Sequence, residues 1–428
     1  MLAIDFGTSN SLVGAWIDGK AYQALSLDPF AADPTLMRTL LYFPDESKAF
    51  YGEQAIQEFV QNDMEGRLFR SFKTHLPNKN YLGTIVGNRI MPLEQMVGIF
   101  LLELKKRAEK VLQQQVHKVV LGRPARYSMD TVADEFAVHR MKKAAEFAGF
   151  TEVHFTPEPL AAAFDFKKSL NKEVTILVGD FGGGTSDFTI IKLGPQKFKK
   201  EDVLAIEGCP LAGDALDALF MQERLNAHFG AKTKYRLPMS DNILTMPSSI
   251  SERLDRPAHI VHLKSKESYE FIKNVKKCTL NPESKRCIDQ LLTLIDDQLI
   301  FEFFEKIEKT KRELSIHEET TFNYEYPGIL VHEVFQKSQF EKWATHTREQ
   351  IFSAVDRSLT SAQLTAADID LVCLTGGTAK VPFIKNELEL RFGKDKLQTQ
   401  TDASQGHFHS VLSGLVESAE MISNGFSQ

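Results

Sequence analysis

The spacing of apolar residues along the first part of the chain predicts short strands followed by amphipathic helices. Four apolar runs predict strands, and the second and third are joined by Asp18-Gly19, a favoured two-residue hairpin turn. Helical spacing then predicts two helices on either side of the buried run VVLGRP, with Gly149 where the second should end. The predicted strands are residues 2–6, 11–17, 20–27 and 40–44, and the predicted helices are residues 92–115 and 129–147.

The later part of the chain repeats this alternation. Buried runs predict strands at residues 175–181, 186–193, 201–207 and 369–375. Ser338 followed by Glu341 predicts a capping box ahead of a long helix, and a last helix over residues 381–392 should close at Gly393. We therefore expect two α/β halves built on a similar plan.

A stretch of different composition separates these later elements. It has no glycine from residue 231 to residue 327, and segments such as CIDQLLTLIDDQLIFEFFEKIEKTKREL have helical periodicity. A mostly helical insertion in the second half fits this stretch best.

Composition limits the class of protein. With 428 residues, 43% of them hydrophobic, the chain can bury the cores of two or three domains. A net charge of −6 argues against a nucleic-acid binder, and the four cysteines lack zinc spacing. No apolar run approaches the roughly 20 residues of a membrane-spanning helix, and no signal peptide follows Met1. We expect a cytoplasmic protein that binds no membrane.

The first chemical motif is AIDFGTSNS at residues 3–11. An apolar strand ends in Asp5, a glycine turn follows at Gly7, and Thr8, Ser9 and Asn10 offer hydroxyls, an amide and backbone N–H groups. Donors at a glycine turn suit phosphate oxygens, and a strand-end aspartate suits a hydrated cation. An ordinary strand and turn is the alternative.

The second motif, GDFGGGTSDF at residues 179–188, repeats this arrangement. Asp180 ends a strand, Gly182, Gly183 and Gly184 expose backbone amides, and Thr185 and Asp187 follow. A flexible hairpin loop is the alternative. Two such turns, one in each half, predict a clamp that holds one polyphosphate from opposite sides.

A third motif, CLTGGTAKVPFI at residues 373–384, places Gly376-Gly377 between a buried strand and a helix. Backbone at such a pair could approach a flat ligand closely. A plain strand-to-helix turn explains the pair equally well.

These motifs, with TPEPLAAAF at residues 156–164, resemble in order the nucleotide-binding domain of the DnaK-type seventy-kilodalton heat-shock chaperones. That domain belongs to the actin/hexokinase-like ATPase superfamily. RSFKTHL resembles the family's catalytic-lysine segment, LAGDALD its glycine pair and IEKTKRELS its adenosine-binding helix. The resemblance covers nearly the whole chain and looks closest to bacterial DnaK-like proteins of about this length.

The resemblance implies an α/β, actin-like ATPase fold of two lobes, each with a ribonuclease-H-like mixed sheet. Lobe I would span residues 1–173 and be completed by a C-terminal helix at 403–428. Lobe II would span residues 174–402, with a helical subdomain inserted at about 221–312.

The resemblance also implies a slow, Mg²⁺-dependent ATPase that binds ATP and ADP. Asp5 and Asp180 would hold the metal, and Lys73, Glu158, Thr185 and Asp187 would be catalytic. The residues implied to bind nucleotide are Gly7, Thr8, Ser9, Asn10, Gly182, Gly183, Gly184, Thr185, Gly213, Glu308, Lys311, Arg312, Ser315, Gly376, Gly377, Thr378 and Lys380.

Departures from the family pattern qualify this inference. Thr8-Ser9 replaces a double threonine, and Lys380 replaces an arginine that would offer a planar stacking surface. The aspartate expected before the last helix falls near Phe408-His409, and the interlobe arginine near Pro124 has no clear counterpart. The family's linker and peptide-binding domain are also missing, so we expect no peptide binding by this chain alone.

Several interpretations therefore remain open. Lys73 could be a solvated lysine, Glu158 a first-turn carboxylate facing a helix dipole, and Lys311 part of a charged solvent face. At the level of function, a sugar kinase of the same fold or a nucleotide-gated scaffold that scarcely hydrolyses ATP are the alternatives. We expect a monomer whose nucleotide-driven lobe closure controls a protein partner, such as a co-chaperone or client adaptor.

Overall fold

The computed structural model describes residues 1–63, 65–70, 72–87, 89–128, 130–167, 172–195, 200–398 and 409–424. The chain divides into two compact units. Unit 1 comprises residues 1–210, 353–379 and 386–428, and unit 2 comprises residues 211–352 and 380–385. The lobe boundaries expected from the resemblance stay a prediction, and Phe408 and the start of the expected helix at residue 403 lie outside the described residues.

Unit 1 contains two mixed β-sheets. The strands of the first sheet are β1 (Leu2–Phe6), β2 (Asn10–Ile17), β3 (Lys20–Tyr22), β4 (Met37–Arg38), β10 (Lys118–Arg123) and β11 (Glu152–Pro157). Those of the second are β12 (Val174–Phe181), β13 (Ser186–Leu193), β14 (Val203–Cys209), β19 (Leu371–Thr375) and β20 (Leu397–Gln398).

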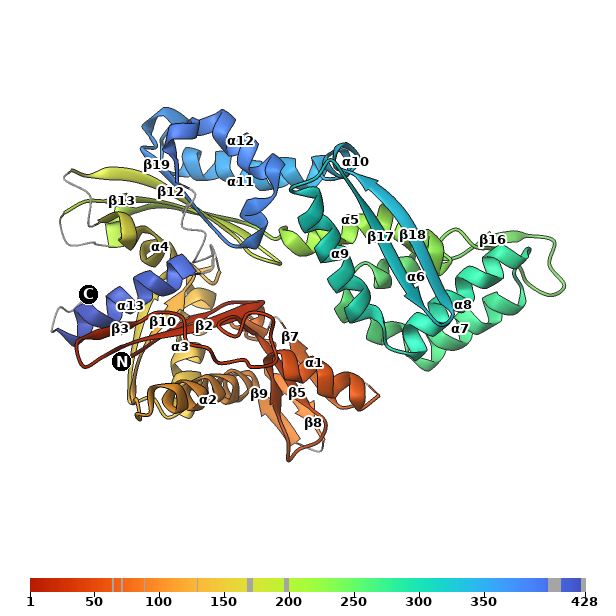
Figure 1. The fold of residues 1–428 in the computed structure, drawn as a ribbon, viewed down its shortest axis with the longest axis horizontal. Helices are drawn as coiled ribbons and strands as arrows, with labels where there is room; N and C mark the ends of the chain where they lie inside the picture. Colours follow the sequence, from red (N-terminus) through yellow and green to blue (C-terminus); the bar gives the residue numbers. More distant parts are fainter. Residues whose placement is uncertain are drawn as a thin grey trace. The chain divides into compact units, whose positions relative to one another are not determined.

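The two sheets share one strand order. In the first, β3, β2 and β1 pair antiparallel and β10 and β11 continue in parallel. In the second, β14, β13 and β12 pair antiparallel and β19 and β20 continue in parallel (Figure 1). The expected similar plan is confirmed, and Asp5 and Asp180 are each the penultimate residue of the equivalent strand.

Helices and short strands complete unit 1. The helices that lie wholly in it are α1 (Gly52–Gln61), α2 (Leu93–Leu112), α3 (Thr131–Phe147), α4 (Glu158–Lys167) and α13 (His409–Ser423). The short strands are β5 (Leu40–Phe43), β6 (Phe50–Tyr51), β7 (Arg67–Arg70), β8 (Gly83–Val86) and β9 (Arg89–Pro92). Two further helices, α11 (Thr345–Ser361) and α12 (Pro382–Phe392), run across the division between the units.

Unit 1 buries two hydrophobic cores. One joins the first sheet to α2 and α3. The other joins both sheets to α4 and α13, because Ala3, Ile176 and Leu412 belong to the same buried cluster. Helices α13 and α4 cross so closely that a Cβ on Gly414 would lie 1.9 Å from the carbonyl oxygen of Ala161.

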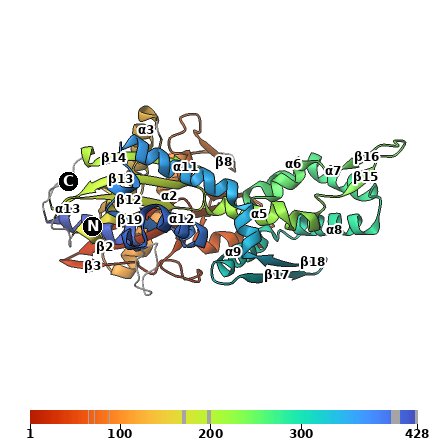
Figure 2. The same ribbon diagram turned by 90° about the horizontal axis from the view of Figure 1, so that it is seen from above.

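Unit 2 is mostly helical, as predicted, with two antiparallel hairpins that the sequence pattern did not predict (Figure 2). Its helices are α5 (Gly213–Glu223), α6 (Ser248–Ser251), α7 (Lys266–Lys277), α8 (Pro282–Asp296), α9 (Ile300–Leu314) and α10 (Lys337–Trp343). Its hairpins are β15 (Lys234–Arg236) with β16 (Ile243–Thr245) and β17 (Glu319–Tyr326) with β18 (Ile329–Gln336). Phe303 of α9 packs edge-on against Phe322 of β17 at 5.1 Å between ring centroids, which fastens the longer hairpin to the helices.

Two local predictions need correction. The predicted strand at residues 20–27 ends at Tyr22. The predicted capping box at Ser338 and Glu341 does not form, because β18 runs to Gln336 and the helix begins directly at Lys337. The backbone N–H of Lys337 donates to Glu318 O at 2.9 Å. Because the helix begins at Lys337, Ser338 lies inside its first turn and cannot cap it.

Among the residues that the structure describes, no helix is both long enough and apolar enough to cross a lipid bilayer.

The close crossing of α13 and α4 generates a prediction about stability. Gly414→Ala should lower the free energy of unfolding by about 1–3 kcal/mol, because the added methyl overpacks the contact with Ala161. Urea unfolding measures this change. Ser423→Ala, at the exposed end of the same helix, is the control and should change it by less than about 0.5 kcal/mol. A Gly414→Ala variant as stable as the parent would show that the helices do not cross this closely.

Candidate functional site

Lys73 lies beside the strand that carries Asp5. The ring of Phe72 packs on Phe6 and on Phe100 of α2, each at 5.8 Å between centroids, and Lys73 follows in the short 3₁₀ helix η1 (Phe72–His75). Lys73 is only 8% exposed, and its Nζ donates to Glu158 Oε1 at 2.9 Å. Lys73 is therefore not a solvated surface lysine.

Asp180 and Asp187 face each other across the hairpin of the second glycine turn. They are direct partners in the antiparallel register of β12 and β13. Thr375, at the end of β19, donates from Oγ1 to Asp180 Oδ1 at 2.8 Å, and Thr185 donates to Asp187 Oδ2 at 2.9 Å. The two hydroxyls fix the two carboxyl groups at the strand ends.

A small cavity connects these groups. Glu158, Asp180, Asp187 and Thr375 line a space of about 30 Å³. That volume is enough for one or two water molecules, and the lining supplies the polar partners that buried water needs.

The carboxyl groups of Asp5, Glu158, Asp180 and Asp187, here named the carboxyl cluster, disfavour one another's charge. Burial, with the charges of Glu158 and Asp180, raises the pKa of Asp5 to about 8. Burial and the charge of Asp180 raise the pKa of Asp187 to about 7, and burial also raises that of Asp180. Burial would lower the pKa of Lys73, but the neighbouring Glu158, Tyr127 and Asp5 raise it overall, so the ammonium stays charged.

The carboxyl cluster fits a hydrated divalent cation. The four carboxyls outnumber the positive groups beside them, the Lys73 ammonium and Arg126 at the cavity wall, so their ionisation leaves an excess of negative charge. Within the described ranges, no three His, Cys, Asp or Glu side chains are grouped closely enough to hold an ion directly. Mg²⁺, which dehydrates reluctantly and binds largely through its waters, suits such a site.

The first glycine turn is held by a threonine that the sequence analysis did not identify. Thr39 is fully buried, its Oγ1 donates to Gly7 O at 2.8 Å, and its N–H donates to Ser9 O at 2.8 Å. Its hydroxyl also lies 2.8 Å from Ser11 Oγ. Thr8, Ser9 and Asn10 therefore belong to a turn whose backbone is fixed from one side.

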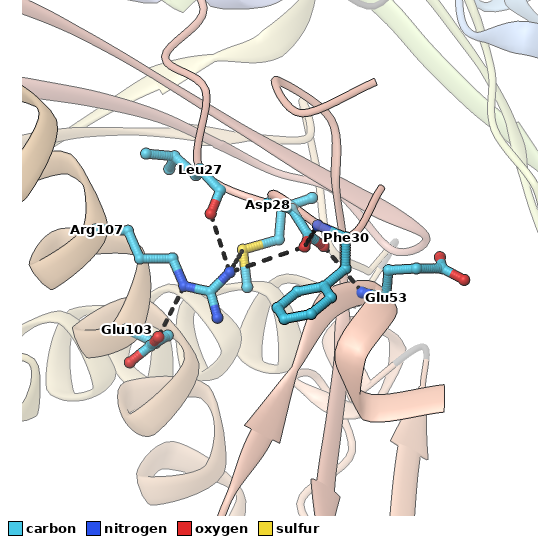
Figure 3. Close-up of polar contacts among 7 residues, drawn as sticks. Leu27, Asp28, Phe30, Glu53, Glu103 and Arg107 are labelled. Carbon is cyan, nitrogen blue, oxygen red and sulfur yellow. Dashed lines mark hydrogen bonds and ion pairs between the residues drawn. The ribbon is translucent and has the colours of Figure 1, made fainter. Parts of the chain in front are cut away.

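A buried aspartate orders the segment that leads to Thr39 (Figure 3). Asp28 accepts hydrogen bonds from the backbone N–H of Glu53, at the start of α1, at 2.9 Å and from that of Phe30 at 3.2 Å. Arg107 of α2 lies 4.0 Å from the Asp28 carboxylate and donates to Leu27 O at 3.0 Å. These contacts tie the segment to α1 and α2.

The second glycine turn and the glycine pair at residues 376–377 are in direct contact. Thr378 donates to Gly182 O at 2.9 Å, and Gly182 N donates to Thr185 O at 2.9 Å. Gly376 has φ +83°, and a Cβ there would lie 2.1 Å from Phe181 O. Gly376 therefore lets the two turns pack on each other, while Gly183 and Gly184 follow in the turn and Gly377 is exposed.

Most residues that the resemblance assigns to adenosine lie in unit 2. Lys311 of α9 is buried, and its Nζ lies 2.8 Å from Asp217 Oδ1 and donates to Gly213 O at 3.3 Å, both in α5. Burial raises the pKa of Asp217 to about 6, although Lys311 opposes the shift. Ser315 donates to Lys311 O at 3.2 Å, whereas Glu308, Arg312 and Lys380 are exposed. Lys311 is thus no part of a solvated charged face.

Sequence reasoning missed several residues of the site. Thr375 ends a buried strand, as Asp5 and Asp180 nearly do, so the same strand-end argument could have found it. Nothing in the local sequence indicated Thr39. Nor did it indicate Tyr127, whose hydroxyl is buried near Lys73 and has no hydrogen-bond partner among the described residues.

Comparison with known proteins supports the family resemblance independently of the site's geometry. The family model described as Hsp70 protein matches residues 45–253 and 288–403. A chaperone protein DnaK of Thermosipho melanesiensis is 25% identical over 402 residues, which are 92% of this chain and 55% of the relative. A chaperone protein HscA homolog of Rickettsia typhi is 27% identical over 307 residues, 68% of this chain and 48% of the relative. The chain spans about half the length of these relatives.

The raised pKa values generate a prediction about pH. Asp5 binds its proton more tightly in the folded protein, so the stability from protonation is full below about pH 4 and is lost as pH rises through about 8. Without metal, the free energy of unfolding should fall by about 1–3 kcal/mol more in the parent than in Asp5→Asn between about pH 5.5 and 8.5. Urea unfolding at both pH values, with exposed Asp241→Asn as control, measures this difference. Parallel pH profiles in all three proteins would mean that Asp5 ionises normally.

Proposed function

Because this chain belongs to the Hsp70 family, we propose that it binds ATP with Mg²⁺ and slowly hydrolyses it to ADP and phosphate. The observation that carries the proposal is the carboxyl cluster around Lys73, which lies in one unit with both glycine turns. A site that gathers partly buried acids, the fixed ammonium of Lys73 and the backbone amides of two glycine turns is suited to a metal-bound polyphosphate.

In this proposal the two glycine turns hold the phosphates. Backbone N–H groups and hydroxyls at residues 7–10 and 182–185 bind the β- and γ-phosphates, and Thr39 keeps the first turn in shape. The adenosine contacts come from Gly213, Glu308, Lys311, Arg312, Ser315, Gly376, Gly377, Thr378 and Lys380, with Lys311 held by Asp217.

Asp5 and Asp180 would hold Mg²⁺ through its water ligands. The ion would supply positive charge that offsets the negative charge of the phosphates. Thr375 keeps the Asp180 carboxylate at the strand end, so that the carboxylate needs little reorganisation when the metal nucleotide arrives.

Catalysis requires mainly positioning and a proton acceptor. The water oxygen bonds to the γ-phosphorus while the bond from that phosphorus to the β–γ bridging oxygen breaks. Asp187, oriented by Thr185 and with a pKa of about 7, accepts the proton of the water. Lys73, oriented by Glu158, stabilises the charge on the γ-phosphate oxygens.

We further propose that the nucleotide state controls a protein partner, such as a co-chaperone or a client adaptor. A bound nucleotide can shift a conformational equilibrium only by binding one conformation more tightly than another. Closure of the protein around ATP, with a partner that distinguishes the ATP state from the ADP state, is the simplest use of such a site.

The metal site generates a prediction about binding. Asp180→Asn should weaken binding of Mg·ATP by at least about tenfold but change binding of metal-free ATP by less than about threefold, because the lost charge faces the metal. Calorimetry with Mg²⁺ and with EDTA separates the two affinities, and Asp241→Asn serves as control. Equal weakening under both conditions would exclude Asp180 from the metal site.

The Lys73–Glu158 pair generates a prediction about rate. Lys73→Ala should lower single-turnover hydrolysis by at least about 100-fold, the order lost with one preorganised charge-stabilising donor, and change ATP affinity much less. Lys106→Ala, at an exposed lysine of α2, is the control and should retain the parent rate. An unchanged rate in Lys73→Ala would refute the catalytic role.

Phosphate release by the parent protein in the absence of any sugar would distinguish hydrolysis from kinase activity. No release above background would favour a scaffold that binds ATP without hydrolysing it.

A further inference from the structure

Arg140 of α3 is a buried arginine. Its guanidinium donates most of its hydrogen bonds to the segment after Lys73. Arg140 is only 2% exposed. Its Nη1 donates to His75 O at 3.3 Å, Leu76 O at 3.3 Å and Asn78 O at 3.0 Å, its Nη2 donates to Tyr81 O at 2.9 Å, and its Nε donates to Glu94 Oε1 at 2.9 Å.

The segment that receives these bonds has little regular structure of its own. After the single 3₁₀ turn of η1, residues 76–82 form turns, in which Asn78 N donates to His75 O and Tyr81 N donates to Asn78 O. The rings of His75 and Tyr81 stack at 4.3 Å and close the segment into a compact loop. The carbonyl groups of this loop point at the Arg140 guanidinium, which satisfies them inside the protein.

Arg140 itself is held on two helices. Its guanidinium lies over the ring of Phe136, one turn earlier in α3, at 4.4 Å from the centroid. Its ion pair reaches Glu94 in the first turn of α2. The guanidinium therefore joins the loop to two helices that share the core with the first sheet.

We propose that Arg140 is a positioning residue for Lys73, and this inference rests on the proposed function. Phe72 anchors the chain before Lys73 to Phe6, and the Arg140 guanidinium anchors the chain after it. Between these anchors the ammonium meets Glu158 at 2.9 Å. A misplacement of about 1 Å can cost a factor of about 100 in rate, so the backbone anchor matters as much as the lysine.

The geometry requires arginine. A planar guanidinium presents donors in several fixed directions, whereas a lysine ammonium offers three donors at one point on a flexible stem. Lysine at position 140 would keep the charge and the pairing with Glu94 but lose most of the four carbonyl contacts. Arg140→Lys is therefore the variant that tests positioning with the least change of charge.

The first measurement needs no ATPase activity. An acetylating reagent followed by peptide mass spectrometry reports the reactivity of Lys73, which is buried and paired in the parent. In Arg140→Lys the acetylation rate of Lys73 should rise at least about fivefold, because the released segment opens locally more often. Arg253→Lys is the matched control, since Arg253 donates to His262 O and Ser268 Oγ in unit 2. It should leave Lys73 protected.

The second measurement uses the activity. In Arg140→Lys, kcat should fall by about 10–100-fold while KM for ATP changes by less than about threefold, since nucleotide contacts remain. Arg253→Lys should retain both values. A purely structural role for Arg140 would lower the melting temperature without this split between kcat and KM.

The outcomes separate the inference from the function on which it rests. If Lys73 stays protected in a folded Arg140→Lys variant, Arg140 does not position it and the inference is wrong. If Lys73 becomes reactive but the parent shows no hydrolysis, the positioning stands and the ATPase proposal fails. If Arg140→Lys does not fold, Glu94→Gln, which removes only the ion pair, gives the test: Lys73 should be acetylated faster than in the parent, and equal rates would overturn the inference.

Discussion

The ion pair between Lys73 and Glu158 is the interaction on which the site depends. It places the buried Lys73 ammonium among four carboxyl groups. Removing one member of such a buried pair typically costs 3–5 kcal/mol, because the other charge is left without compensation. Neighbouring elements hold both members of the pair in place. Phe72 packs the lysine segment against Phe6, and α13 packs on α4, the helix that begins with Glu158.

The same burial links stability to function. Asp5 and Asp187 lie partly buried among other carboxyl groups, so their ionisation is costly and their pKa values rise toward neutrality. In the proposed function, a bound cation would offset this cost. The hydroxyls of Thr185 and Thr375 hydrogen-bond two of these carboxyl groups and hold them at the strand ends.

Local pattern was enough to predict most strands and helices of unit 1, because apolar periodicity is a property of neighbouring residues. It also predicted that Asp5 and Asp180 end equivalent strands. It failed at Ser338, where a strand passes directly into a helix, and at the hairpins of unit 2. Thr39 and Arg140 could not be found, because both bind backbone carbonyls brought from distant positions, and a carbonyl leaves no mark in the sequence. The roles assigned to site residues stay predictions.

The packing of α13 has a consequence for the order in which the protein can fold during synthesis. The helix fills the core that β1, β2 and β10 share with α4, so residues at opposite ends of the sequence complete one another. A ribosome releases the first sheet long before residues 409–424 are made. One face of that sheet therefore keeps apolar side chains exposed to solvent or to a holding chaperone until residues 409–424 have emerged.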